Sequence, residues 1–125
     1  MKQKMENPVG YFEIPVADLE RAVTFYKSVF DYEFELVNID GNQMAMFPQT
    51  AEASGITGAL AKGDSYIPGK QGSRLYFSVD NIEVTLQKAE SSGGKVIYPK
   101  TSIGDLGSVA EFEDSEGNCI ALHSA

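Results

Sequence analysis

The 125-residue sequence contains one cysteine, and no stretch of it is long and apolar. Because Cys119 has no second cysteine with which to pair, a disulfide within the chain is excluded. The N-terminal segment MKQKMENP lacks the apolar run of a secretory signal peptide, and no stretch approaches the ~20 apolar residues that a membrane-spanning helix requires. We therefore expect a soluble protein of the cytoplasm.

Basic residues are also few. The sequence has 10 basic and 18 acidic residues, which gives a net charge of −8. This charge repels nucleic-acid phosphates and anionic lipid headgroups over about one Debye length, which is ~8 Å at physiological salt. The sequence has no phosphate-binding loop, no dinucleotide-binding fingerprint and no nucleophile elbow. Nucleic acids and membranes are therefore not expected as partners.

The hydrophobic pattern of residues 10–26, GYFEIPVADLERAVTFY, changes its period in the middle. Phe12, Ile14 and Val16 alternate with their neighbours, as in a strand that is buried on one side. From Leu19 onward, apolar residues recur at helical spacing. The sequence therefore predicts a strand that leads directly into a helix.

Three further strands are expected after this first helix. Asp40-Gly41 separates the runs FELVNI and NQMAMF, and Asp-Gly between two strand-like runs favours a two-residue hairpin. The apolar run ITGALA, residues 56–61, supplies a fourth strand. The glycine- and proline-containing residues 62–72 are typical of a linker.

The same order of elements then restarts. RLYFSVDN alternates like the first strand, a helical stretch follows, and Asp80 with Glu83 resembles a capping box at the start of this helix. KVIYP, SVAEFED and CIALHS supply three more strands, the last two joined by a turn at residues 115–118. We therefore predict one α+β domain, residues 1–125, that contains two βαβββ units, residues 8–61 and 73–125.

Alternation assigns the two faces of the predicted sheets. The following apolar residues should pack under the helices: Phe12, Ile14, Val16, Leu75, Phe77, Val79, Ile120 and Leu122. The opposite set should face a cleft shared by the two units: Tyr11, Glu13, Arg74, Tyr76, Ser78, Cys119, Ala121 and His123, with Glu111 on the neighbouring strand. The cleft is therefore the expected functional site.

Three residues of the cleft-facing set are candidate catalytic residues. Glu13 and Arg74 lie on equivalent strands and are expected to approach each other. In one interpretation Arg74 binds a substrate carboxylate or enolate oxygen while Glu13 acts as general base; in the other, the two only form an ion pair. His123, the single imidazole, is the third candidate as a general acid or base, or else it is a surface or interface residue near the C-terminus.

Aromatic and methionine side chains could line the wall of the cleft, because such surfaces suit flat organic ligands. The alternative is that these residues belong to the core. The candidate substrate-binding residues are Tyr11, Tyr76, Met44, Met46 and Glu111, and Phe47 could also line the wall. Nothing in the sequence places an activating base beside Cys119, which we expect to be a small buried residue.

The segments DLERAVTFYKSVF and EDSEGN, together with YFSVDNIE, resemble the vicinal-oxygen-chelate superfamily of glyoxalases, bleomycin-resistance proteins and dioxygenases. The similarity covers nearly the whole chain and is greatest to the branch related to lactoylglutathione lyase. It implies two paired βαβββ units around a U-shaped cleft and, by analogy, a homodimer. Metal-dependent members of this superfamily use a divalent ion as a Lewis acid on two adjacent substrate oxygens.

Carried over residue by residue, the four metal-ligand positions of such members fall on Tyr11, on Gly58 or Ala59, on Arg74 and on Ala121. None of these is a good ligand for a divalent ion, and the permanent charge of Arg74 would repel it. An iron site of two histidines and one carboxylate is also excluded, because the chain has one histidine. We therefore expect no metal and no cofactor.

Three functions remain open after the sequence is considered. The first is metal-free binding of a small organic molecule. The second is a lyase or isomerase related to lactoylglutathione lyase, with Glu13 or His123 abstracting a proton next to a carbonyl and Arg74 stabilising the oxyanion. The third is a metal-dependent glyoxalase with a different ligand set, namely Glu13, Glu111 and His123.

Overall fold

The computed structural model describes residues 7–50 and 55–125. The first unit contains β1 (Phe12–Pro15), α1 (Leu19–Phe30), β2 (Glu35–Ile39), β3 (Asn42–Met46) and β4 (Gly58–Lys62). The second contains β5 (Tyr76–Ser78), α2 (Ile82–Ser91), β6 (Lys95–Ser102), the short 3₁₀ helix η1 (Gly104–Leu106), β7 (Ser108–Glu113) and β8 (Cys119–Ser124). No helix in the described ranges is long and apolar enough to cross a membrane.

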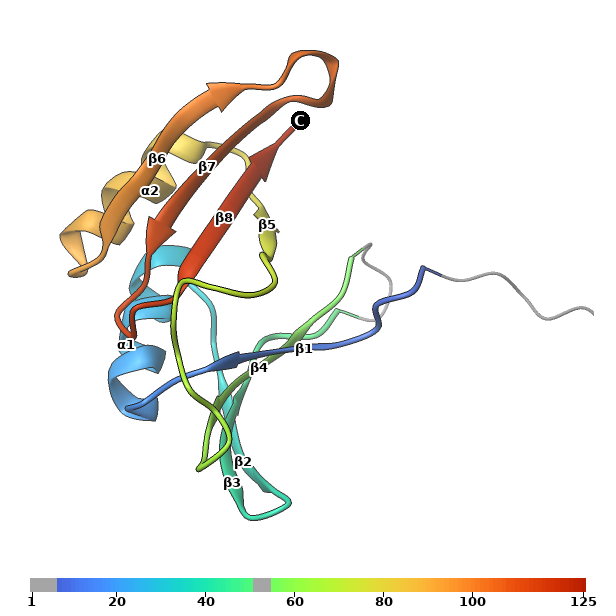
Figure 1. The fold of residues 1–125 in the computed structure, drawn as a ribbon, viewed down its shortest axis with the longest axis vertical. Helices are drawn as coiled ribbons and strands as arrows, with labels where there is room; N and C mark the ends of the chain where they lie inside the picture. Colours follow the sequence, from blue (N-terminus) through green and yellow to red (C-terminus); the bar gives the residue numbers. More distant parts are fainter. Residues whose placement is uncertain (1–6, 51–54) are drawn as a thin grey trace, which may run out of the picture.

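Each unit forms a four-stranded mixed sheet, in the order β1-β4-β3-β2 and β5-β8-β7-β6 (Figure 1). The first strand of each unit pairs in parallel with the last strand, β1 with β4 and β5 with β8. The other strand pairs are antiparallel. The predicted α+β architecture of two βαβββ units is confirmed, and in each sheet the first strand lies at an edge.

Two turns of the first unit, of which Asp40-Gly41 was predicted, use residues in the left-handed region of backbone conformation. Asp40 and Gly41 join β2 to β3 with φ angles of 53° and 79°, as a two-residue hairpin with two positive φ angles requires. Asp31 ends α1 with a φ of 62°, and its N–H donates to the carbonyl of Lys27. The hairpin at Asp40-Gly41 is therefore confirmed.

The cap of α2 differs from the predicted capping box by one residue. Asn81 has the extended backbone of a cap, and its Oδ1 accepts a hydrogen bond from the N–H of Val84 at 3.1 Å. The helix therefore begins one residue later than the pairing of Asp80 with Glu83 implied. Both Asp and Asn are good caps, so the sequence alone did not distinguish two adjacent candidates.

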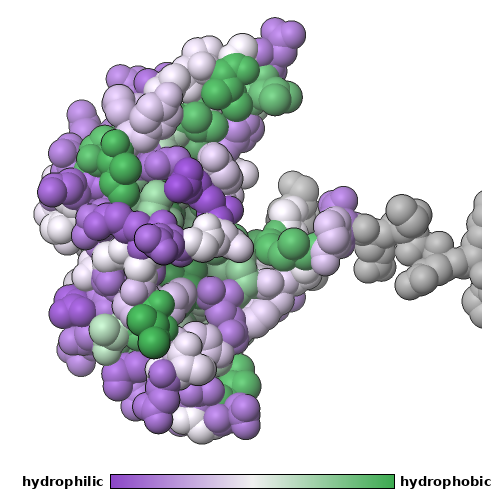
Figure 2. Space-filling view, viewed as in Figure 1, coloured by the Kyte–Doolittle hydropathy of each residue, from purple (hydrophilic) through white to green (hydrophobic). Residues whose placement is uncertain are grey.

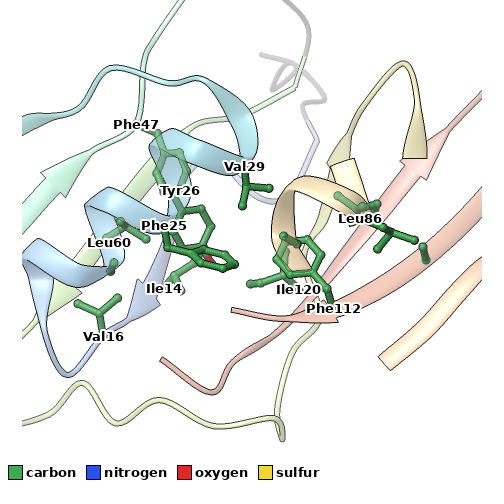
Figure 3. Packing of buried hydrophobic residues seen from close by; sticks show 14 of the residues in the cluster. Ile14, Val16, Phe25, Tyr26, Val29, Phe47, Leu60, Leu86, Phe112 and Ile120 are labelled. Carbon is green, nitrogen blue, oxygen red and sulfur yellow. The ribbon is translucent and has the colours of Figure 1, made fainter. Parts of the chain in front are cut away.

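The helix-facing sides of both sheets pack into one continuous core (Figure 3). All of the residues predicted to pack under the helices are members of this core or pack against it. Aromatic rings join the two units, with ring centroids of Phe25 and Phe112 6.1 Å apart and those of Phe12 and Phe77 6.0 Å apart. The shared core therefore fixes how the two units lie against each other.

The turn between β7 and β8 also holds the first unit, through Glu116. The carboxylate of Glu116 accepts hydrogen bonds from the backbone N–H groups of Ala17 and Asp18, both at 2.9 Å, at the start of α1. It also forms an ion pair with Arg21 at 2.7 Å. A carboxylate at a helix N-terminus is favoured by the free N–H groups and the helix dipole. A residue of the second unit thus stabilises the first helix.

Two other side chains of the same turn are buried and bind the first unit and the linker. Asp114 accepts a hydrogen bond from the hydroxyl of Tyr26 at 2.6 Å. The amide of Asn118 donates to the carbonyl of Pro15 at 2.8 Å and accepts from the N–H of Gly69 at 2.9 Å. This turn therefore fixes the end of β1 and the middle of the linker together.

Candidate ligand-binding site

A half-open cavity of 640 Å³ lies between the two units. Its walls are formed by the start of β1, the residues that follow β3 and precede β4, and β5. In Figure 2 the outline of the molecule is a crescent that is hollowed on its right-hand side, where β1 begins and β5 lies. Among the residues 7–50 and 55–125 that the structure describes, none of those that line the cavity is charged, although 22% of the sequence is. The cavity therefore suits an uncharged ligand.

Three aromatic rings give the cavity an apolar wall. The centroids of Phe12 and Phe47 are 5.3 Å apart, and those of Phe47 and Phe77 are 5.9 Å apart. Phe47 and Tyr76 were expected to line a pocket wall, and both line this cavity. Phe12 and Phe77 were expected only to pack under the helices, and they also line it. Alternation assigns each residue to one face of a sheet. It does not reveal that an aromatic ring on an edge strand can also be accessible to a ligand in the cavity.

Glu13 lies on the opposite side of β1, where two phenols bind its carboxylate. Tyr11 donates a hydrogen bond to Oε2 at 3.0 Å, and Tyr66 donates to Oε1 at 2.6 Å. The hydrogen bond to Glu13 raises the pKa of Tyr66 to about 12, and burial together with Glu13 raises the pKa of Tyr11. Both phenols therefore stay protonated at neutral pH and act as donors. Tyr66 comes from the linker, where no periodicity indicates a side-chain position.

Met44 is buried beneath Tyr66 rather than exposed on a pocket wall. It is 2% exposed and forms a small cluster with Ala59 and Ala61, against which Tyr66 and Met46 pack. Met44 therefore does not lie on an open wall of this structure, because Tyr66 of the linker packs against its cluster, and its contact with a ligand stays a prediction. Met46 is half-buried at the side of the same cluster.

The ion pair predicted between Glu13 and Arg74 is not formed, because Arg74 pairs with Glu111. Nη1 of Arg74 lies 2.9 Å from Oε2 of Glu111, and the thiol of Cys119 donates to Oε1 of the same carboxylate at 3.7 Å. Burial and the charge of Glu111 raise the pKa of the Cys119 thiol. This thiol therefore stays protonated at neutral pH and is a poor nucleophile.

His123 has a further, separate partner. Its Nε2 lies 2.6 Å from the carbonyl oxygen of Leu106, and because a carbonyl only accepts, this nitrogen carries the proton. Glu13 is bound to tyrosines, Arg74 to Glu111, and His123 to the backbone. The three candidate catalytic residues thus have three different sets of partners within the chain.

The four positions to which the family resemblance assigns metal ligands do not fit a metal ion. Ala59 pairs with Glu13 on β1 and Ala121 pairs with Tyr76 on β5, so the two alanines occupy equivalent places in the two sheets. Both are completely buried and offer only a methyl group. At the two remaining positions, the Tyr11 hydroxyl donates to a carboxylate and Arg74 is a cation. This donor set offers no ligands for a divalent cation.

The alternative ligand set of Glu13, Glu111 and His123 is not assembled either. Within residues 7–50 and 55–125, no three His, Cys, Asp or Glu side chains lie close enough together to hold a metal ion. The carboxylate of Glu111 instead serves Arg74 and Cys119. The described residues therefore supply no support for a metal-dependent glyoxalase.

Two βαβββ units that share a core and enclose a cavity define a protein of the glyoxalase-like class. The model of the glyoxalase/bleomycin resistance protein/dioxygenase superfamily matches residues 9–122, so the chain belongs to this superfamily. A glyoxylase-like domain-containing protein of Didymella fabae is 29% identical over 122 residues, which are 94% of this chain and 94% of that protein. The resemblance inferred from the sequence is confirmed.

Solved structures of the same fold include proteins with different descriptions. The glyoxylase/bleomycin resistance protein/dioxygenase domain from Frankia sp. EAN1pec has a TM-score of 0.75 at 17% identity, covering 97% of this chain and 99% of that one. The antibiotic binding protein TnmS3 from Streptomyces sp. CB03234 has a TM-score of 0.70 at 21% identity, with 98% of both chains covered. The E144Q mutant of glyoxalase I from Zea mays has a TM-score of 0.69 at 16% identity, with 94% of this chain and 46% of that chain covered. These likenesses establish the fold.

Proposed function

We propose that this protein binds a small, uncharged and largely aromatic organic molecule in the cavity between its two units, without a metal ion. The observation that carries this proposal is the cavity itself, which has ligand-sized volume and no charged residue among the described residues of its lining. Its 640 Å³ falls within the range of about 300–1,000 Å³ that is usual for small-molecule sites. Aromatic rings held by the core provide a preformed wall, which reduces the ordering cost of binding.

The chemistry of the metal-ligand positions supports a metal-independent site. The four positions, which fall on Tyr11, on Gly58 or Ala59, on Arg74 and on Ala121, offer neither imidazole nor carboxylate to a divalent ion. That a protein of this fold is described as an antibiotic binding protein supports a binding role for the architecture. The described residues therefore provide all the groups that metal-independent binding requires.

A lyase or isomerase is the less supported alternative. Proton abstraction next to a carbonyl requires a base and an oxyanion stabiliser that face the same substrate atoms. In this chain the carboxylate of Glu13 binds two phenols, while the guanidinium of Arg74 is partly neutralised by Glu111. We favour binding over turnover because each candidate group is already engaged elsewhere.

We also propose that the protein is a homodimer. β1 and β5 are edge strands, so one side of each offers unpaired backbone groups of the kind that another chain can cover. Tyr76 on β5 is 52% exposed, a large fraction for an aromatic side chain beside an apolar cavity. Light scattering coupled to size-exclusion chromatography tests this proposal, since a mass equal to one chain would contradict it.

The binding proposal is tested with N-phenyl-1-naphthylamine, an uncharged aromatic probe whose fluorescence rises in apolar surroundings. We expect saturable binding with one site per chain and the same dissociation constant with and without EDTA. Loss of binding in EDTA would contradict a metal-independent site. Fluorescence that rises linearly with probe concentration, without saturation, would contradict the site altogether.

A further inference from the structure

Of the charged side chains that were predicted to face the cleft or that lie near it, some form ion pairs and others do not. Arg74 is bound to Glu111 at 2.9 Å, and Lys70 of the linker is bound to Glu113 at 3.0 Å. Glu13, in contrast, has no cationic partner among the residues that the structure describes. Arg74 and Lys70 are therefore paired with carboxylates, whereas the exposed carboxylate of Glu13 has no cationic partner in the described part of the chain.

The carboxylate of Glu13 is also held in one orientation. Tyr11 and Tyr66 each donate one hydrogen bond to a different oxygen, at 3.0 Å and 2.6 Å. An ionised carboxylate has about four acceptor positions, so two of them remain for a further donor. Because the two phenols only donate at neutral pH, they stabilise the negative charge and do not remove it.

The surroundings of Glu13 are aromatic and polarisable. The rings of Tyr11 and Tyr66 reach the carboxylate from β1 and from the linker, and Tyr66 packs on Met44. Aromatic faces attract organic cations, and the interaction is worth ~0.5–1 kcal/mol at exposed sites. A fixed anion beside two aromatic rings is thus suited to a positively charged organic group.

We infer that Glu13, Tyr11 and Tyr66 form a binding subsite for an organic cation, such as a quaternary or primary ammonium group. The subsite lies on the opposite side of β1 from the uncharged cavity, because Glu13 and Phe12 alternate along the strand. It is therefore independent of the neutral ligand proposed above. The net charge of −8 adds a long-range attraction for such a ligand.

A pair of isosteric probes tests this inference in the full chain. Choline carries a quaternary ammonium, whereas 3,3-dimethyl-1-butanol has the same shape without the charge. We expect choline to produce saturable shifts in two-dimensional amide NMR spectra that are greatest at residues 11–13 and 66. The butanol should produce no saturable shift there at equal concentration.

Glu13→Gln removes the charge and keeps the shape of the side chain. We expect it to weaken choline binding at least about tenfold, which corresponds to about 1.4 kcal/mol. The matched control is Glu35→Gln. Glu35 is exposed on the same face of the first sheet as Glu13, and the strand register aligns the two residues across the sheet, three strands apart. It removes the same unit of net charge, and we expect a change of less than about twofold, since exposed charges are screened over ~10 Å.

Three results would overturn the inference. The first is equal binding of choline and its uncharged isostere, and the second is an equal loss of affinity in the Glu13→Gln and Glu35→Gln variants. The third is the absence of saturable choline shifts near Glu13. Each of these results leaves the binding of the uncharged naphthylamine probe unaffected, so failure of this inference is distinguishable from failure of the cavity proposal.

Discussion

Glu116, in the turn between β7 and β8, forms an ion pair with Arg21 on α1 across 95 residues of sequence. The Glu116 side chain is completely buried, and its oxygens also accept from the backbone at the start of α1. The relationship joins the second unit to the first helix next to the shared core. It therefore helps to set the separation of the two units between which the cavity lies.

This contact predicts an acid-dependent loss of stability. Burial raises the pKa of Glu116, but hydrogen bonds from Arg21 and from the backbone of Asp18 outweigh it and lower the pKa from 4.5 to about 2. Because the folded pKa is depressed, the stabilisation is complete above the unfolded value and is lost as pH falls from about 4.5 to about 2. We expect Glu116→Gln to lower the free energy of unfolding at pH 7 by about 1.5–3 kcal/mol.

Urea unfolding between pH 7 and pH 3 measures this effect. The wild-type protein should lose stability more steeply below pH 4.5 than the Glu116→Gln variant. Glu20→Gln is the matched control, because Glu20 is an exposed acidic residue in the first turn of the same helix. Identical pH profiles of the wild type and the Glu116→Gln variant would show that this carboxylate does not stabilise the fold.

The buried pair of Tyr26 and Asp114 predicts a second stability effect. Tyr26→Phe removes the phenol that donates to Asp114 at 2.6 Å and leaves a buried carboxylate with one donor fewer. We expect a loss of about 1–3 kcal/mol in the free energy of unfolding, measured in urea at pH 7. Tyr32→Phe is the control, since no hydrogen bond of the Tyr32 hydroxyl is found in the described part of the chain. Equal losses in the two variants would contradict a specific role for the Tyr26 hydroxyl.

The single thiol reports on the Arg74–Glu111 pair. Burial and Glu111 raise the pKa of Cys119, so at pH 7 we expect slower alkylation by iodoacetamide than for free cysteine. Glu111→Gln removes the negative charge and leaves Arg74 beside the thiol, which should lower the thiol pKa and accelerate alkylation several-fold. Glu113→Gln serves as the control, because Glu113 is bound to Lys70. A rate unchanged by Glu111→Gln would refute the contact between Cys119 and Glu111.

The alternation of the strands was sufficient to predict which residues belong to the core and which lie on the opposite faces. Ile14 and Leu122 are buried as expected, and Asp40-Gly41 forms the expected hairpin. These features are local, because a strand repeats every two residues and a tight turn requires particular residue types. Sequence reasoning therefore succeeds where the cause lies within a few residues.

Contacts between distant segments were not predictable in the same way. Alternation predicted that Glu13 and Arg74 face the cleft but did not identify their partners, Tyr66 and Glu111. Tyr66 lies in a linker without periodicity, and nothing near Glu116 in the sequence indicates that it reaches α1. The side-chain partners of a site depend on tertiary packing, which a one-dimensional pattern does not encode.

The most direct test of the proposed function compares two tyrosine variants on the same sheet. Tyr76 lines the cavity, whereas Tyr98 on β6 is 44% exposed and does not line it. With N-phenyl-1-naphthylamine titrated in the presence of EDTA, Tyr76→Ala should raise the dissociation constant roughly five- to tenfold, because the lost ring is part of the wall. Tyr98→Ala should leave it within about twofold of the wild type. Equal affinity of the wild type and Tyr76→Ala would contradict ligand binding in the cavity between the two units.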